Sequence, residues 1–190
     1  ASAFGFDKMP RIGLNLSDEL YAYYQGSVTE PVRLPYEDQS FDAVVSVGVL
    51  EHVHETGGNE VESLREIHRL LKPGGVFICY HLPNRYSWIE WSLRRLGKWS
   101  HTHRYTHRDI TTLTGSASLH LLESGRYAIL PRNIWGWVDR QHKLPLSHEI
   151  ARIYDRLDNV LSGLASPICQ NYYFVAQRLE RQQTSSTTAV

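Results

Sequence analysis

Histidine side chains stand at two places in this chain where they could carry chemistry. His52 follows Glu51 at the end of an apolar run, and three more histidines fall within HTHRYTH, residues 101–107. Imidazole titrates near neutral pH, so His52 is a candidate general base for an acceptor that must lose a proton. The alternative is a histidine that only holds its own loop in place through a local hydrogen bond.

The HTHRYTH segment allows three interpretations. Neutral imidazoles at this spacing can ligate zinc or nickel, but no carboxylate or thiolate cluster stands near them in the sequence, and we therefore expect no metal site. We prefer a polar wall of an acceptor-binding pocket, with local surface structure as the alternative. The side chains expected to bind the acceptor here are His101, His103, Arg104 and Tyr105.

A strand must place Glu51 and His52. The turn-rich Pro35–Ser40 leads into the apolar run Ala43–Val47, which predicts a strand in the interior of a sheet, buried on both faces. Open α/β sheets bind their ligands at the carboxyl ends of such strands. We therefore expect Gly48 and the residues after it to border a ligand site.

A helix and a second strand follow. The helix begins near Asn59, and Val61, Leu64 and Ile67 share one of its faces. Pro73-Gly74-Gly75 should end it, since proline cannot continue a helix and glycine supplies a left-handed cap. The next strand is Val76–His81. A strand, a helix and a strand in this order predict a parallel pair with a right-handed crossover.

The remaining pattern alternates in the same way. It predicts further strands at Ile12–Leu16, Tyr21–Val28, Tyr127–Leu130 and Asn171–Gln177, and helices at Ser87–Leu96, after Thr106, and at Ser147–Leu164. Thr106 and Asp109 have the spacing of a capping box. We expect one domain over residues 1–181, with a helical insertion at about 138–166 and a disordered tail at 182–190.

Two segments resemble a known family. LPYEDQSFD with LEH (residues 34–52) and SLREIHRLLKPGG (residues 63–75) are similar to the fourth strand, its loop and the next helix of class I S-adenosylmethionine-dependent methyltransferases. The resemblance covers about residues 12 to 82. It implies a Rossmann-like, mostly parallel α/β sheet with helices on both faces, a C-terminal antiparallel strand, and S-adenosyl-L-methionine as cofactor.

The same resemblance implies a cofactor site and an acceptor site. Its positions assign cofactor contacts to Gly48, Val49, Leu50 and Glu51, and further contacts to Asn15 after the second strand and to Ser27 and Val28 after the third. His81 and Asn84 would line the acceptor pocket. Methyl transfer from a sulfonium is an in-line displacement, so positioning supplies much of the acceleration.

Three departures from the family weaken the cofactor site. The sequence has no G-x-G-x-G loop, and Gly5 is either the last glycine of such a loop or an ordinary loop glycine. Asn15 and Ser27 stand where relatives carry carboxylates, and a neutral partner forfeits a charge-assisted hydrogen bond. We therefore expect a domain that lacks its first strand and binds S-adenosylmethionine weakly.

Composition limits the partners and the compartment. The 190 residues include 20 basic and 20 acidic side chains, so nucleic acid is not expected as a partner. Cys79 and Cys169 stand far apart with no signal-like start, which favours a cytoplasmic, reducing environment. No apolar run is long enough to span a bilayer.

The segment Trp88–Leu96 bears on the choice of acceptor. It mixes aromatic side chains with Arg94 and Arg95, which fits core packing, a lid over an apolar acceptor, or peripheral contact with a membrane. We favour an exposed segment and a small-molecule or lipid-like acceptor. The alternative is a catalytically silent binding or interaction module, and a nicotinamide-binding Rossmann enzyme fits the motifs less well.

Overall fold

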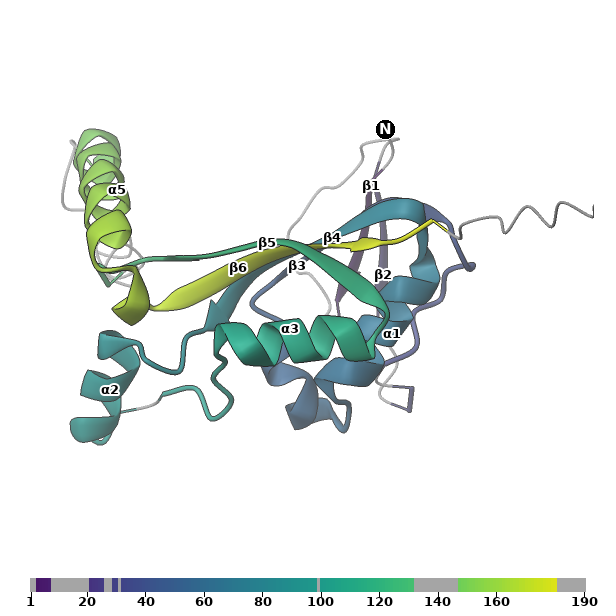
Figure 1. Cartoon of the computed structure of the whole chain (residues 1–190), viewed down its shortest axis with the longest axis horizontal. Helices are drawn as coiled ribbons and strands as arrows, with labels where there is room; N and C mark the ends of the chain where they lie inside the picture. Colours follow the sequence, from purple (N-terminus) through teal and green to yellow (C-terminus); the bar gives the residue numbers. More distant parts are fainter. Residues whose placement is uncertain are drawn as a thin grey trace, which may run out of the picture.

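The computed structural model describes residues 3–7, 21–25, 29–30, 32–98, 100–131 and 147–180. Its strands are β1 (Ala3–Asp7), β2 (Tyr21–Gln25), β3 (Phe41–Val47), β4 (Leu71–Pro83), β5 (Leu119–Tyr127) and β6 (Asn171–Arg178) (Figure 1). Its helices are α1 (Glu60–Leu70), α2 (Trp88–Arg95), α3 (His107–Ser116) and α5 (Ser147–Leu164), with short 3-10 helices η1 (Leu50–Thr56) and η2 (Ser166–Ile168).

The four-stranded α/β sheet is mostly parallel with one reversed strand, as the sequence predicted. Four strands pair in the order β3-β4-β6-β5, and β1 pairs with β2 in a separate parallel pair. β3 and β4 are parallel, which confirms the predicted strand–helix–strand unit. β6 runs antiparallel to both β4 and β5, so the expected C-terminal reversal is also present.

Local sequence explains why α1 and α3 begin where they do. Asn59 accepts a hydrogen bond from the backbone N–H of Glu62 at 2.9 Å, which satisfies one of the open donors at the start of α1. Thr106 and Asp109 form the predicted capping box at the start of α3. Both helices then pack apolar side chains against β4, β5 and β6, and the shared core includes Leu64, Ile67, Phe77, Ile110, Phe174 and Ala176.

Three element predictions need correction. β3 is the end strand of the four-stranded sheet, and its Val45 and Val47 are 60% and 52% exposed in the described structure, so this strand is not buried on both faces. α1 covers only its other face. The strand predicted at Tyr127–Leu130 instead ends at Tyr127, because Ala128 has a left-handed backbone with φ of 64°. Helix α1 ends at Leu70, and Gly74 takes its φ of 79° in a bulge of β4.

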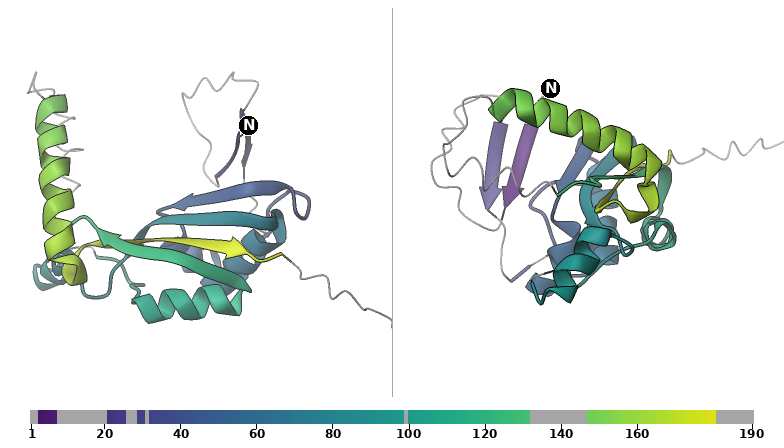
Figure 2. Two further views of the ribbon diagram at one scale, coloured as in Figure 1. Left: turned by 45° about the horizontal axis from the view of Figure 1, so that its top comes forward. Right: turned by 90° about the vertical axis from the view of Figure 1, so that its left-hand side faces the viewer.

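Two helices lie away from the layer formed by α1 and α3. Figure 2 shows α5 standing across one end of the sheet. It is held there by Asp158, which accepts a hydrogen bond from the backbone N–H of Leu130 at 2.7 Å. α2 follows β4 and is capped by Ser87. α2 begins at Trp88, five residues after β4 ends at Pro83, so it starts beside the carboxyl end of β4. The predicted strand Ile12–Leu16, the tail after residue 181 and part of the predicted insertion lie outside the described residues.

Candidate functional site

The carboxyl ends of β3 and β4 lie side by side and lead into two sharp turns. Gly48 has φ of 63° and donates its backbone N–H to the carbonyl of Tyr80 at 3.0 Å. His81 has φ of 64°, an uncommon value for a residue with a side chain, and it interacts with Tyr127 through its backbone N–H and its ring. The two turns direct the chain away from the sheet at the edge where α/β proteins bind ligands.

The segment 101–105 is fastened to the same edge. Tyr105 donates its backbone N–H to the carbonyl of Pro83 at 2.8 Å and accepts one from Arg85 at 2.9 Å. His101 is fixed from α2: Glu90 accepts its backbone N–H at 3.0 Å and shares a hydrogen bond with its Nδ1 at 2.9 Å. Burial alone would raise the pKa of Glu90, but these bonds from His101 outweigh it and lower the pKa.

A cleft of about 190 Å³ lies between η1 and this segment. The rings of His52 and His101 are 5.7 Å apart across it, and those of His54 and His103 stack at 4.0 Å. The prediction that His52 and the segment His101–Tyr105 face one cleft therefore holds for His101, Thr102 and His103, whereas Arg104 and Tyr105 are not among the lining residues. The side chains that line the cleft are Glu51, His52, His54, Glu55, His101, Thr102 and His103.

Glu51 forms the floor of the cleft and is incompletely satisfied. Its side chain is only 3% exposed, and Oε2 has no hydrogen-bond partner among the described residues. Oε1 lies 3.9 Å from Nε2 of His52. Burial raises the pKa of Glu51, and its own backbone N–H and His52 offset that only in part. A buried carboxylate oxygen without a partner is unfavourable unless a ligand approaches it.

A second group of polar side chains stands next to the first and is satisfied internally. Glu60 accepts a hydrogen bond from Tyr105 at 2.6 Å with one oxygen, and its other oxygen lies 2.7 Å from Nε2 of His54. Burial would raise the pKa of Glu60, but these partners lower it overall. This group ties α1 to η1 and to the segment 101–105.

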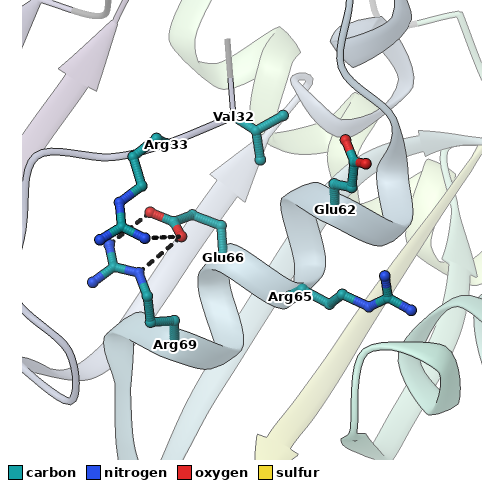
Figure 3. A pocket seen from close by; sticks show the side chains of 6 residues that line it. All are labelled: Val32, Arg33, Glu62, Arg65, Glu66 and Arg69. Carbon is teal, nitrogen blue, oxygen red and sulfur yellow. Dashed lines mark hydrogen bonds and ion pairs between the residues drawn. The ribbon is translucent and has the colours of Figure 1, made fainter. Parts of the chain in front are cut away.

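A larger pocket, of about 340 Å³, lies along the outer side of α1 and not at the carboxyl ends of the strands (Figure 3). Arg69 makes two bonds to the carboxylate of Glu66, at 2.8 and 2.6 Å, and reaches Asp38 at 2.6 Å. Glu66 also accepts the backbone N–H of Leu34 at 2.8 Å. These bonds fasten the loop before β3 to α1, so we assign the pocket a structural role.

Several residues predicted for the site take other roles. Leu50 is 2% exposed and belongs to the core, so packing accounts for it without a ligand contact. Asn84 is fully buried, and its amide donates to the carbonyls of Pro167 and Cys169, which leaves it unable to line an acceptor pocket. Tyr105 is 5% exposed behind the cleft wall.

The other predicted positions divide into placed and undescribed residues. Val49 is 56% exposed beside Gly48, and His81 is exposed. The Arg104 Nε is buried without a hydrogen-bond partner in the described structure, and burial lowers the pKa of that side chain. Gly5 lies within β1 opposite Tyr23, so it belongs neither to a glycine-rich loop nor to an ordinary loop. Asn15, Ser27 and Val28 lie outside the described residues.

Sequence reasoning missed three acidic positions and a histidine. Asp7 ends β1, at the carboxyl end of the separate parallel pair β1–β2, and the sequence signal was the apolar AFGF run followed by an acid. His54 lines the cleft from η1, and Glu60 of α1 and Glu90 of α2 hold His54 and His101. No local pattern marks these three, because they meet the histidines only in the folded chain.

Comparisons with known proteins indicate a methyltransferase domain. Residues 10–79 match the family model described as a methyltransferase domain. An uncharacterized protein of Escherichia coli, YafE, is 30% identical over 128 residues, which is 65% of this chain and 59% of that protein. A ubiquinone/menaquinone biosynthesis C-methyltransferase, UbiE, of Bartonella tribocorum is 38% identical over 73 residues, or 35% of this chain and 26% of that enzyme.

Solved structures show the same fold. A methyltransferase of Haloferax volcanii, solved in complex with the Trm112 activator, superposes with a TM-score of 0.60 at 19% identity and covers 94% of this chain and 73% of its own. A S-adenosylmethionine-dependent methyltransferase of Thermotoga maritima gives a TM-score of 0.58 at 13% identity, covering 93% and 72%.

The fold and the position of the cleft define the class I methyltransferase architecture. With the match of residues 10–79 to the methyltransferase domain, they make the chain similar to the S-adenosylmethionine-dependent methyltransferases of this class. S-adenosyl-L-methionine is the cofactor that this match indicates. The chain spans 59% and 26% of the two curated relatives named above.

Proposed function

We propose that this domain transfers a methyl group from S-adenosylmethionine to a small-molecule or lipid-like acceptor held in the cleft between η1 and the segment 101–103. The observation that carries the proposal is the buried, unsatisfied Glu51 together with His52 and His101, at the carboxyl end of β3. The family match does not favour the alternative of a catalytically silent module.

The cofactor fits the edge next to this cleft. A Cβ on Gly48 would meet atoms only at 3.8 Å and beyond, so the backbone there is open to a close approach. Val47 and Val49 are both more than half exposed and offer apolar contact to it. Asn15 remains a predicted contact, and Asp7 at the end of β1 is a second candidate for it, because a carboxylate can accept charge-assisted hydrogen bonds from ribose hydroxyls. Ser27 and Val28 remain predicted contacts.

The bound cofactor would supply a methyl group on a sulfonium, which moves to the acceptor as the sulfur–carbon bond breaks. The chain's own part is to hold the acceptor in line with that bond and to take up any proton the acceptor releases. His52 is placed for the second task, since its Nδ1 is held by Glu55 at 2.7 Å and its Nε2 is turned toward Glu51. His81, His101, His103 and Arg104 are the polar groups proposed to orient the acceptor.

The acceptor class is argued from the surface of α2. Trp91 is 60% exposed, with the guanidinium of Arg95 over its ring at 5.1 Å, and Leu96 is 69% exposed. Trp88 is 38% exposed and donates its Nε1–H to the carbonyl of Ile129 at 2.7 Å. An apolar patch with arginines beside it suits a bulky apolar acceptor or peripheral membrane contact. In the described part of the chain, no helix is long and apolar enough to cross a membrane.

Charge and cysteines bear on partner and compartment. Equal numbers of basic and acidic residues support a small acceptor in preference to nucleic acid. Cys79 and Cys169 are both buried and unpaired, which supports the proposal of a reducing, cytoplasmic environment.

The test compares two glycines with the same backbone. Gly48 and Gly97 have φ of 63° and 62°, so alanine at either position should cost about 1–2 kcal/mol of stability through the left-handed conformation. Only Gly48→Ala adds a methyl group beside the cofactor, so equilibrium dialysis with labelled S-adenosylmethionine at millimolar concentration should show lost binding in that variant alone. Equal binding by Gly48→Ala and Gly97→Ala would overturn the proposed cofactor position.

A further inference from the structure

We propose that Glu51, His52 and His101 form a binding site for one divalent transition-metal ion of the zinc type. One carboxylate oxygen and one nitrogen from each imidazole lie within 4.8 Å of one another. Two imidazoles and a carboxylate are a ligand set that suits zinc, cobalt, nickel and iron, whereas magnesium and calcium prefer oxygen alone. The proposal does not depend on the binding of S-adenosylmethionine.

Each histidine of this set is oriented by its own carboxylate. Nδ1 of His52 lies 2.7 Å from Oε1 of Glu55, and Nδ1 of His101 lies 2.9 Å from Oε1 of Glu90. When Nδ1 donates to a carboxylate, the neutral ring carries its lone pair on Nε2, which is the form that ligates a metal. A carboxylate behind each imidazole is the usual support of metal-bound histidines. Here the arrangement occurs twice, on two imidazoles that face one another across a single cleft.

The third ligand explains an otherwise unfavourable feature. The Glu51 side chain is 3% exposed, and its Oε2 has no hydrogen-bond partner among the residues the structure describes. A buried carboxylate normally gains partners for both oxygens. A cation between Glu51 and the two imidazoles would supply the missing partner.

The neighbouring group makes an internal comparison. His54, Glu60 and His103 also bring three ligand atoms within 4.8 Å. There, however, both carboxylate oxygens of Glu60 already have partners, and the two rings stack at 4.0 Å with only 18° between their planes. Stacked rings direct their nitrogen lone pairs along parallel planes and not toward one point. We therefore place the ion at Glu51 and not at Glu60.

The expectation of no metal rested on distance in the sequence. Glu51 comes from η1 and Glu90 from α2, and the fold brings both against the HTHRYTH segment. Three protein ligands would leave at least one coordination position open to the cleft. An acceptor hydroxyl or amine bound there would be polarised by the ion. With the ion bound, His52 would act as a ligand, and the role of proton acceptor proposed for it above would apply only to the metal-free chain.

The experiment uses the whole chain after treatment with a chelator, and no cofactor. Co²⁺ is titrated with detection of its visible absorption, and Zn²⁺ by calorimetry. We expect one ion per chain, with ligand-field bands of a four- or five-coordinate nitrogen and oxygen site. Glu51→Gln and His101→Asn should each weaken binding at least about 10-fold, since even the loss of a supporting partner costs that much. His103→Asn is the matched control and should bind as the parent does.

Three results would overturn the proposal. They are the absence of saturable Co²⁺ or Zn²⁺ binding by the parent chain, full binding by Glu51→Gln, and a loss in His103→Asn as large as that in His101→Asn. Circular dichroism verifies that each variant is folded, and His52→Asn replaces any variant that is not. Because no S-adenosylmethionine is present, failure here leaves the proposed methyl transfer intact.

Discussion

The two pockets of this domain differ in how their charged groups are satisfied. In the pocket on α1, Arg69 and Glu66 bind one another and three neighbouring loop residues, so these two charged groups already have partners. In the cleft at the end of β3, Glu51 keeps a buried oxygen without a partner in the described structure. The pocket on α1 is nearly twice as large, yet the cleft holds the histidine side chains and the unpartnered carboxylate oxygen. Unsatisfied polarity, and not volume, therefore marks the candidate functional site.

The largest effect should come from breaking the pocket on α1. Arg69→Met keeps the length of the side chain but leaves Glu66 buried without its main partner, and it frees the carbonyls of Leu34 and Tyr36. We expect a loss of about 3 kcal/mol in the free energy of unfolding, the low end for one partner of a buried ion pair. Urea denaturation measures it. A loss below about 1 kcal/mol, as for a surface pair, would contradict a structural role for this pocket.

A smaller loss should come from the satisfied group beside the cleft. Tyr105→Phe removes the hydroxyl that donates to Glu60 at 2.6 Å. We expect a loss of about 2 kcal/mol in the free energy of unfolding, as for other hydrogen bonds to charged partners, with metal binding unchanged. Burial and the bond to Glu60 also raise the pKa of Tyr105, so its hydroxyl is held as a donor. If metal binding were lost together with stability, the group around Glu60 and the group around Glu51 would depend on one another.

The pH dependence of stability should report the ion pair in the pocket on α1. Burial works to raise the pKa of Glu66, but Arg69 lowers it overall, so its ionised form stabilises the folded state. This contribution is present above the ordinary glutamate pKa of about 4.3 and is lost as the pH falls through the lower folded value. Urea titrations of the parent and Glu66→Gln should converge in acid. A difference that persists at the lowest pH would contradict the ion pair as its cause.

The smallest effect, with the opposite sign, is expected in the cleft. Glu51→Gln replaces a buried charge that lacks a full set of partners by a neutral amide of the same shape, so the metal-free chain should gain stability, by up to about 1 kcal/mol. Thermal unfolding in the presence of a chelator measures it. Destabilisation by more than about 1 kcal/mol would mean that Glu51 is satisfied in the folded chain and would remove the argument for a ligand there.

Elements that carry their signal locally could be predicted from the sequence. The caps at Asn59 and Thr106, the parallel β3–β4 unit and the reversal at β6 all follow from short patterns and are present. β1 was missed because a strand of five residues with a central glycine shows little alternation of apolar and polar side chains. The position that binds the ribose in relatives was therefore predicted at Asn15 and not at the end of this strand. Residue types near the end of a strand therefore predicted the edge of the sheet, but not every strand in it.

The site was predictable in position and less so in composition. Glu51, His52 and His101 meet in the cleft beside Gly48, because strand ends fix where their loops begin. Asn84 and Leu50 turned inward, since their partners lie in η2 and the core and have no sequence signal near them. Glu90 and Glu60 were missed for the same reason. Side-chain partners that depend on tertiary contacts are thus the part that sequence alone left open.

The central claim is that S-adenosylmethionine binds at the carboxyl end of β3, beside the cleft and away from the pocket on α1. The most direct test is a titration of the ¹⁵N-labelled chain with S-adenosylhomocysteine, followed by backbone amide shifts, because this method reports both tight and weak binding. We predict saturable shifts at Gly48, Val49 and Glu51, with Arg65 and Glu66 unaffected. Shifts confined to Arg65 and Glu66, or none at Gly48–Glu51 at millimolar ligand, would contradict the claim.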